Sequence, residues 1–224
     1  MADKAGVLIV GAGSGLSASL ARLFAAEGMK VSLAARSTGK LADLAKDTGA
    51  QVLTCDATQA REVDELFARV DPGVVVYNPS YRVRGPLVDL DREEVRKTLM
   101  VSAYGGFLVG QAAAKRMLPR GSGAIFFTGA SASVKGYGES APFAMGKFAL
   151  RGLAQSMARE LAPQGLHVAH FVIDGAIAAP GRSVPGEDAM LSPDEIAKSY
   201  LQVYRQQRSA WSWELELRPW VEKF

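Results

Sequence analysis

Cysteine and histidine are both scarce in this chain of 224 residues. Cys55 is the only cysteine, and His167 and His170 are the only histidines. A single cysteine cannot form a disulfide within the chain, and so few thiols and imidazoles exclude metal centres built from cysteine and histidine. The two histidines also lie three positions apart on a predicted strand, so their side chains point to opposite faces. Catalysis must therefore rest on hydroxyls, carboxylates, lysine or a bound cofactor, and we predict no metal.

An excess of one charge and long apolar runs are also lacking. Lysine and arginine number 26 against 23 aspartates and glutamates, which gives a net charge of +3. So balanced a surface does not indicate a nucleic-acid partner. Near the start of the chain only residues 7–10 form an unbroken run of large apolar side chains, which is too short for a signal peptide or a membrane span. We therefore predict a cytoplasmic protein without a nucleic-acid or membrane partner.

Short apolar runs alternate with longer amphipathic stretches along the whole chain, a pattern typical of repeated βα units. The predicted strands are residues 7–10, 30–34, 51–54, 73–77, 124–128, 167–173 and 213–217. The predicted helices are residues 16–27, 40–47, 60–70, 93–117, 143–161 and 193–205. Most of these strands are apolar throughout, as expected for strands covered on both faces. The sequence predicts one α/β domain over residues 1–224, a doubly wound parallel sheet of about seven strands with helices on both faces.

Glycines cluster between the first predicted strand and the first predicted helix, at Gly11, Gly13 and Gly15. Glycine permits a tight turn and close approach of a ligand, and the following helix N-terminus attracts a pyrophosphate. The spacing differs from the G-x-G-x-x-G of dinucleotide-binding turns, so a glycine turn without a ligand is the alternative. The position between strand and helix in an alternating chain favours a nucleotide site.

Arg36 follows the second predicted strand, where an acidic residue would bind the ribose 2′-hydroxyl of NAD. An arginine can pair with a 2′-phosphate instead. We therefore predict that NADP(H) is preferred over NAD(H). The alternative is an arginine that is merely solvated in a loop.

The order and spacing of several motifs resemble those of short-chain dehydrogenases/reductases from about residue 7 to residue 217. Residues 11–17 resemble the T-G-x-x-x-G-x-G turn of that family, residues 77–80 its N-N-A-G segment, and residues 143–147 its Y-x-x-x-K motif. Asp56 stands where the family contacts adenine, and residues 172–175 resemble its segment ending in Pro-Gly. The resemblance and the turn together predict these cofactor-binding residues: Gly11, Gly13, Ser14, Gly15, Leu16, Arg36, Asp56, Ala57, Asn78, Lys147, Gly175 and Ile177.

The catalytic positions depart from the family pattern. Phe143 occupies the place of the tyrosine that exchanges a proton with the substrate, and a phenyl ring has no ionisable group. Losing positioned acid–base catalysis typically costs about 10²- to 10⁴-fold in rate. The catalytic serine falls on Ala130, with Ser131 one place later, and the family's asparagine corresponds to Ser102. Of the family's four catalytic positions, which hold tyrosine, serine, asparagine and lysine, only Lys147 keeps both its identity and its position. The resemblance implies that Lys147 binds the nicotinamide ribose.

The predicted catalytic residues are Lys147, Ser131 and Ser102. Ser131, Tyr81 and Asp174 each follow a predicted strand and are candidates to replace the missing proton donor. Each has an ordinary alternative, because Ser131 can cap a loop, Tyr81 can be a packing residue and Asp174-Gly175 is a common turn pair.

All three tryptophans fall in the last fourteen residues, at Trp211, Trp213 and Trp220. Apolar and polar residues alternate over residues 211–217, which indicates a strand with one apolar face. An aromatic tail can cover a core or form an interface. Because members of the family are commonly dimers or tetramers, we predict a homo-oligomer with the tail near a subunit contact.

These features predict an NADP(H)-dependent oxidoreductase with an altered proton-transfer site, which reduces a carbonyl or an activated double bond of a small molecule. Hydride transfer is the chemistry of the cofactor, and the protein supplies orientation and electrostatics. The alternative is a dinucleotide-binding sensor or partner subunit with little turnover. Phe143 and Ala130 favour the alternative, whereas Asn78 and Lys147 favour the enzyme.

Overall fold

The computed structural model describes residues 6–179 and 181–222, so the ends of the predicted domain, residues 1–5 and 223–224, lie outside the described residues. In the described chain, seven strands form one sheet in the order β3-β2-β1-β4-β5-β6-β7. Their bounds are β1 Gly6–Val10, β2 Val31–Ala35, β3 Gln51–Thr54, β4 Pro72–Tyr77, β5 Gly123–Thr128, β6 Leu166–Ile173 and β7 Glu214–Leu217. All neighbouring strands are parallel. The predicted doubly wound parallel sheet is confirmed.

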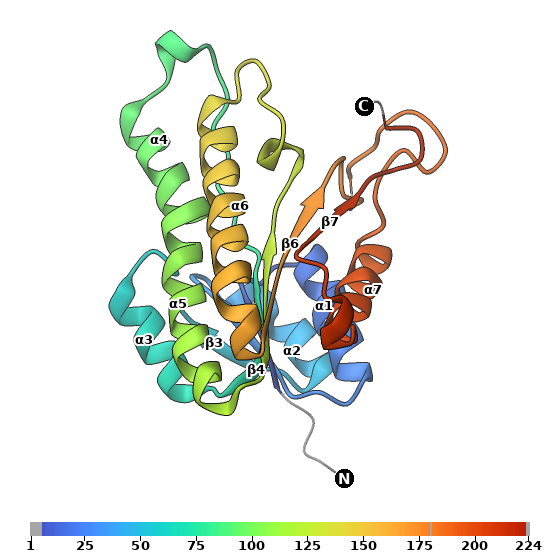
Figure 1. Cartoon of the computed structure of the whole chain (residues 1–224). Coiled ribbons are helices and arrows are strands. Elements are labelled where there is room, and N and C mark those ends of the chain that lie inside the picture. The colour runs from blue at the N-terminus through green and yellow to red at the C-terminus, as the bar shows by residue number, and fades with distance from the viewer. Residues whose placement is uncertain (1–5, 180, 223–224) are drawn as a thin grey trace.

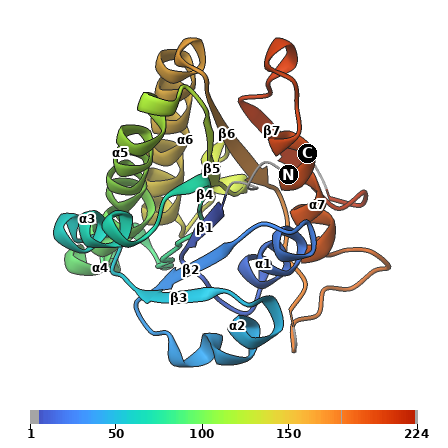
Figure 2. The same cartoon turned by 90° about the horizontal axis from the view of Figure 1, so that it is seen from below.

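Helices cover both faces of this sheet (Figure 1 and Figure 2). Their bounds are α1 Leu16–Ala26, α2 Ala42–Thr48, α3 Ala60–Arg69, α4 Arg92–Leu99, α5 Gly105–Met117, α6 Ala141–Leu161 and α7 Pro193–Tyr204. Buried side chains form one apolar core with α1, α2 and α7 and a second with α3, α5 and α6. All eight residues of β6 are buried between these layers. This double burial explains why the strands read as continuous apolar runs rather than as alternating patterns.

The predicted single helix over residues 93–117 is wrong in one detail. A π-turn at Met100–Tyr104 separates α4 from α5. The Tyr77 hydroxyl donates a hydrogen bond to the carbonyl of Val101. A hydroxyl that donates to a helical carbonyl competes with the backbone N–H that would otherwise bind that carbonyl. Such competition is a recognised cause of local breaks in the α-helical hydrogen-bond pattern. The predicted helix did not include this turn, because the hydroxyl that bonds there comes from Tyr77, which lies outside the helix.

The C-terminal strand begins one residue later than predicted and ends at Leu217. The Trp211 ring stacks on the His167 ring with centroids 4.6 Å apart, and Arg151 lies over the Trp213 ring at 5.6 Å. Trp220 is 79% exposed. The first two tryptophans therefore pack on the fold, and the third is available at the surface. Among the described residues, no helix is both long and apolar enough to cross a membrane.

Candidate active site

Two adjoining cavities lie at the edge of the sheet where the strands end. The first cavity has about 430 Å³ and is lined by residues that follow β1, β2, β3 and β4. The second cavity has about 310 Å³ and is lined by residues that follow β4, β5 and β6, together with side chains of α6. Asn78 and Ser80 line both. The carboxyl edge of a parallel sheet is where this architecture binds its ligands, so the two cavities form the candidate site.

The glycine turn borders the first cavity. Gly11 has φ of +79°, and a Cβ there would lie 2.6 Å from the backbone nitrogen of Pro79, so glycine is required. A Cβ on Gly13 or Gly15 would have no neighbouring atom within 4 Å, so the turn faces open space that a ligand can enter. Ser14 and Leu16 continue this turn into α1, with Ser14 exposed and Leu16 buried.

Two side chains, those of Ser17 and Asn78, hold this turn in place. The Ser17 hydroxyl donates to the carbonyl of Gly11 at 3.2 Å, and the Asn78 amide donates to the Ser17 hydroxyl at 2.7 Å. Asn78 was predicted to bind the cofactor, whereas Ser17 was not among the predicted site residues. The signal for Ser17 is its position as the second residue of α1, from which its hydroxyl reaches the carbonyl of Gly11.

The other predicted residues of the nucleotide half also line the first cavity, namely Arg36, Asp56 and Ala57. Arg36 is exposed and follows β2 directly. The Asp56 carboxylate accepts hydrogen bonds from the backbone N–H and the hydroxyl of Thr58, at 2.9 and 2.8 Å. Burial, reinforced by the nearby carboxylates of Glu62 and Asp56, raises the pKa of the Cys55 thiol to about 11. The only thiol is therefore protonated and unreactive at neutral pH.

Lys147 lies in the second cavity. Its side chain is buried, and its Nζ donates to the carbonyl of Thr128 at 2.8 Å. Burial lowers the pKa of Lys147 to about 8. The Phe143 ring lies one helical turn away, with its centroid 5.9 Å from that Nζ. On α6, the helix that carries both residues, the same face therefore presents a cation and a phenyl ring to one cavity.

The three predicted catalytic residues do not all line the same cavity. Ser131 lines the second cavity with Lys147, and so does Ala130. Ser102 lies in the π-turn, outside the lining of both cavities, and its buried hydroxyl has no hydrogen-bond partner in the part of the chain that the structure describes. A Cβ on Gly146 would lie 2.8 Å from the Cβ of Ser102, so α6 packs closely on the π-turn at this point. Ser102 is therefore placed beside the backbone of α6, next to the residue that precedes Lys147.

Asp174 is engaged in an ion cluster. Its carboxylate, 2% exposed, lies 2.9 Å from the Nζ of Lys135 and 3.1 Å from a guanidinium nitrogen of Arg218. Burial alone would raise the pKa of Asp174, but hydrogen bonds from Ser131 and Lys135 outweigh burial and hold the pKa below its usual value. A carboxyl group that is ionised at neutral pH is a poor proton donor, which weakens the case for Asp174 in that role.

The structure also places the predicted residues Tyr81, Gly175 and Ile177. The Tyr81 hydroxyl donates to the carboxylate of Glu94 on α4, and the Nζ of Lys97 lies 4.5 Å from its ring centroid. Tyr81 is therefore outside the lining of both cavities, held against α4. Gly175 and Ile177, which were predicted to bind the cofactor, line the second cavity.

The two histidines lie on opposite faces of β6, as predicted. His167 meets the edge of the Phe126 ring and stacks on Trp211. His170 lies on the α6 side, with its Nδ1 3.1 Å from the carboxylate of Glu214. Burial lowers the pKa of His170 to about 4, so its ring is neutral at physiological pH. Neither side chain lines the two cavities of the candidate site.

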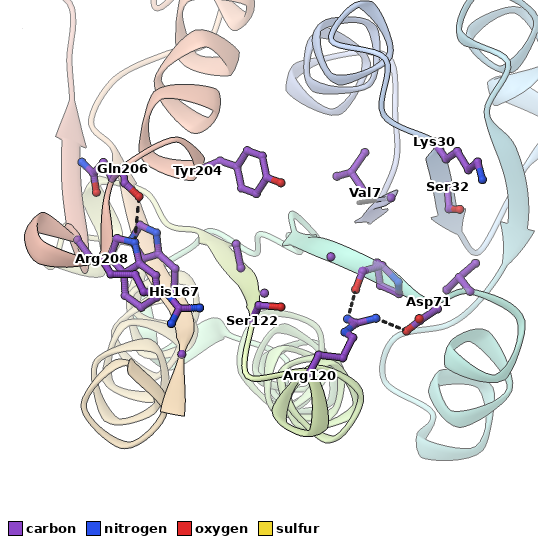
Figure 3. A pocket seen from close by; sticks show the side chains of 18 of the residues that line it. Val7, Lys30, Ser32, Asp71, Arg120, Ser122, His167, Tyr204, Gln206 and Arg208 are labelled. Carbon is purple, nitrogen blue, oxygen red and sulfur yellow. Dashed lines mark hydrogen bonds and ion pairs between the residues drawn. The ribbon is translucent and has the colours of Figure 1, made fainter. Parts of the chain in front are cut away.

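A larger cavity of about 690 Å³ opens at the other edge of the sheet, where the strands begin (Figure 3). Arg120 crosses part of it, donating to the carboxylate of Asp71 at 2.7 Å and to the carbonyl of Pro72 at 2.8 Å. None of the predicted site residues lines this cavity. This cavity is not a candidate active site, because ligands in doubly wound folds bind at the carboxyl ends of the strands.

Comparison with known proteins gives a consistent result. A family model described as short chain dehydrogenase matches residues 5–182. An uncharacterized oxidoreductase of Staphylococcus aureus (strain N315) is 28% identical over 232 residues, which is 98% of both chains. A 3-dehydrosphinganine reductase of Arabidopsis thaliana is 34% identical over 173 residues, 72% of this chain and 52% of that one.

A solved structure agrees over nearly the full length. The crystal structure of a short-chain dehydrogenase from Rhodopseudomonas palustris is 36% identical, with a TM-score of 0.84, and the match covers 96% of this chain and 98% of that one. The family model alone matches well over half of the chain. The chain therefore belongs to the short-chain dehydrogenase family and is an NAD(P)-dependent oxidoreductase.

Proposed function

We propose that this oxidoreductase uses NADP(H) to reduce a carbonyl or an activated double bond of a small molecule, with an altered proton-transfer site. The observation that carries the proposal is the junction of the two cavities. The cavity of the glycine turn and Arg36 adjoins, at Asn78 and Ser80, the cavity of Lys147. One dinucleotide can therefore extend from the turn to Lys147.

The residues of the first cavity fit the adenosine half of such a cofactor. Gly11 brings the backbone close, and open space beyond Gly13 and Gly15 leaves room for a pyrophosphate. The exposed guanidinium of Arg36 would pair with the 2′-phosphate, and Asp56 with Ala57 would border the adenine. When bound, the cofactor supplies a hydride to the substrate.

In the second cavity Lys147 would hold the nicotinamide ribose. Its ammonium is fixed to the Thr128 carbonyl, and its remaining N–H groups are free to bind hydroxyls. With a pKa of about 8, Lys147 is also able to release a proton close to neutral pH. Ser131 is the hydroxyl nearest in role to the family serine, and it would have to give up its bond to Asp174 in order to donate to a substrate oxygen.

The altered site follows from Phe143. Its ring is 8% exposed at the second cavity, where the family tyrosine would present a hydroxyl. The same observation favours a second function, a dinucleotide-binding protein with little turnover. The two functions differ in one measurable respect, since only the first consumes NADPH.

Binding and turnover should therefore be measured together. Binding of NADPH is followed by its fluorescence, and its oxidation by absorbance with a panel of carbonyl and enoyl compounds. We expect turnover that is abolished in Lys147→Ala and unchanged in Lys46→Ala, an exposed lysine on α2. Tight binding without turnover on any compound would favour the binding protein. Failure to bind NADPH at all would refute both.

Cofactor choice is tested separately at Arg36. We expect Arg36→Ala to weaken NADPH binding by about tenfold or more and to leave NADH binding nearly unchanged, because the lost charge-assisted hydrogen bonds go only to the 2′-phosphate. An unchanged ratio of the two affinities would refute the assignment.

We also propose a homo-oligomer, which the apolar surface supports. The exposed faces of the π-turn, α5 and α6 carry large apolar side chains, namely Tyr104, Phe107, Met145 and Phe148, each 42–51% exposed. Such clustering is typical of interaction surfaces. Trp220 in the tail is a further exposed aromatic.

A further inference from the structure

The second cavity has an unusual balance of charge. Arg82, Arg182 and Lys147 line it, and none of its described lining residues is an aspartate or glutamate. The carboxylate of Asp174, which follows β6, already contacts Lys135 and Arg218. The cavity therefore presents cationic groups without a built-in anion to balance them.

The two arginines are not paired with carboxylates within the described part of the chain. Arg182 donates to the carbonyl of Ile177 at 3.1 Å, which satisfies one N–H group but no charge. Burial, together with the positive charges of Arg84 and Arg182, lowers the pKa of Arg82. Mutual repulsion of this kind is relieved when an anion binds between the groups.

Arg82 is also oriented toward the reaction centre. Its guanidinium carbon lies 4.9 Å from the centroid of the Phe143 ring, over which it stacks. Stacking on an aromatic ring leaves the edge of the planar guanidinium free to bind a carboxylate through two parallel hydrogen bonds. Phe143 thus provides an aromatic face that holds a cation at the cavity.

We propose that the substrate is a small organic carboxylate, whose carboxylate group binds Arg82 and Arg182 while its reducible group points toward Lys147. This inference rests on the proposed function and specifies its substrate class. A guanidinium pair favours a carboxylate because planar bidentate pairing matches its two oxygens. The cationic lining of the cavity is then explained by recognition of an anion beside the cofactor.

The test compares carboxylates with neutral amides of the same shape. The protein saturated with NADP⁺ is titrated calorimetrically with acetate and acetamide, pyruvate and pyruvamide, and benzoate and benzamide. We expect at least one carboxylate to bind about 10- to 100-fold more tightly than its amide, the range for hydrogen bonds to charged groups. The preference should shrink as sodium chloride is added, because salt screens charges at an open cavity.

Variants assign the preference to the arginines. Arg82→Met and Arg182→Met should each weaken carboxylate binding by about tenfold while leaving amide and NADP⁺ binding unchanged. Arg84→Met is the matched control, because Arg84 lies on the same loop but does not line the cavity, and it should change the carboxylate affinity little. Equal binding of acids and amides, absence of acid binding at millimolar concentration, or loss of NADP⁺ affinity in Arg82→Met would each overturn the inference. Failure to bind NADP⁺ at all would instead overturn the proposed function.

Discussion

At the scale of single residues, the buried lysine and the phenylalanine one turn before it decide what the second cavity can do. Lys147 is buried and has no carboxylate partner among the described residues, which disfavours its charged form. Such a group is expensive for the fold and is kept where function needs it. The cost of burying Lys147 can be measured as a change in stability. The effect of the hydroxyl that Phe143 lacks can be measured as a change in reaction rate.

Removing the buried charge should stabilise the protein without cofactor. In the folded state the pKa of Lys147 is about 8 against 10.5 in the unfolded chain, so the unfolded state binds more protons between these pH values and wild-type stability rises with pH across that window. We expect Lys147→Met to raise the free energy of unfolding by roughly 1–3 kcal/mol at pH 7, after the lost bond to Thr128 is counted. The gain should disappear by about pH 10.5. Urea denaturation of both proteins at several pH values checks this, and a difference that does not vary with pH would contradict it.

Restoring a hydroxyl at the second cavity should increase carbonyl reduction. We expect Phe143→Tyr to raise the rate with a reducible carbonyl compound by about 10²- to 10⁴-fold, the usual contribution of a positioned acid. Phe148→Tyr makes the same chemical change on the exposed face of α6 and serves as the control. Steady-state oxidation of NADPH is the measurement. Equal rates in the wild type and Phe143→Tyr would show that proton transfer is not limited by the missing hydroxyl.

At the scale of elements, the π-turn shows what a sequence pattern can and cannot predict. The strands could be placed to within a residue or two because they are short apolar runs bounded by polar residues and glycine. Ser131 could be placed at the site because it follows a strand whose carboxyl end lies at the ligand-binding edge, whereas Lys147 on α6 was placed there by the resemblance to the family motif. The contact of Tyr77 with the carbonyl of Val101 could not, since it joins residues 24 positions apart without any periodic signal.

The sequence also could not predict which residues the cationic side chains around the candidate site contact. Arg82 lies over Phe143, which is 61 residues later in the chain, and Asp174 joins Lys135 to the tail residue Arg218. These pairs depend on how loops pack after the sheet is formed, and loops carry no periodic pattern to read. The residues were visible in the sequence, but their partners were not.

The π-turn should depend on one hydroxyl. We expect Tyr77→Phe to lower the free energy of unfolding by about 1–3 kcal/mol, because the carbonyl of Val101 loses its buried donor. Tyr81→Phe is the control, since the Tyr81 hydroxyl binds Glu94 near the surface and its loss should cost less. Urea denaturation at pH 7 measures both variants. A smaller loss in Tyr77→Phe than in Tyr81→Phe would show that the hydroxyl does not hold the turn.

At the scale of the whole molecule, the C-terminal tail is tied to the sheet by charge as well as by aromatic packing. Arg218 and Lys135 both contact the buried carboxylate of Asp174, directly after β6. This cluster links the loop after β5 to the last residues of the chain. We therefore expect shortening of the tail to affect both the stability of the protein and its assembly.

Two truncations separate these effects. Ending the chain after Leu217 removes Arg218 and should lower the free energy of unfolding by about 1–3 kcal/mol, because a buried carboxylate loses one of its cations. Ending it after Pro219 keeps Arg218 and removes Trp220, so we expect nearly unchanged stability and a smaller assembly by light scattering. If the truncation after Pro219 keeps the assembly of the full chain, the tail is not part of a subunit contact.

The junction of the two cavities at Asn78 has a consequence for how ligands compete. A dinucleotide that fills both cavities is a bivalent ligand, whose second half meets its cavity at a high effective concentration once the first half is bound. Asn78 is fixed to the glycine turn through Ser17, so the span between the halves is set by the fold rather than by the ligand. Mononucleotide fragments in the cell therefore compete poorly with the intact cofactor, even where each fragment makes all the contacts of its own half.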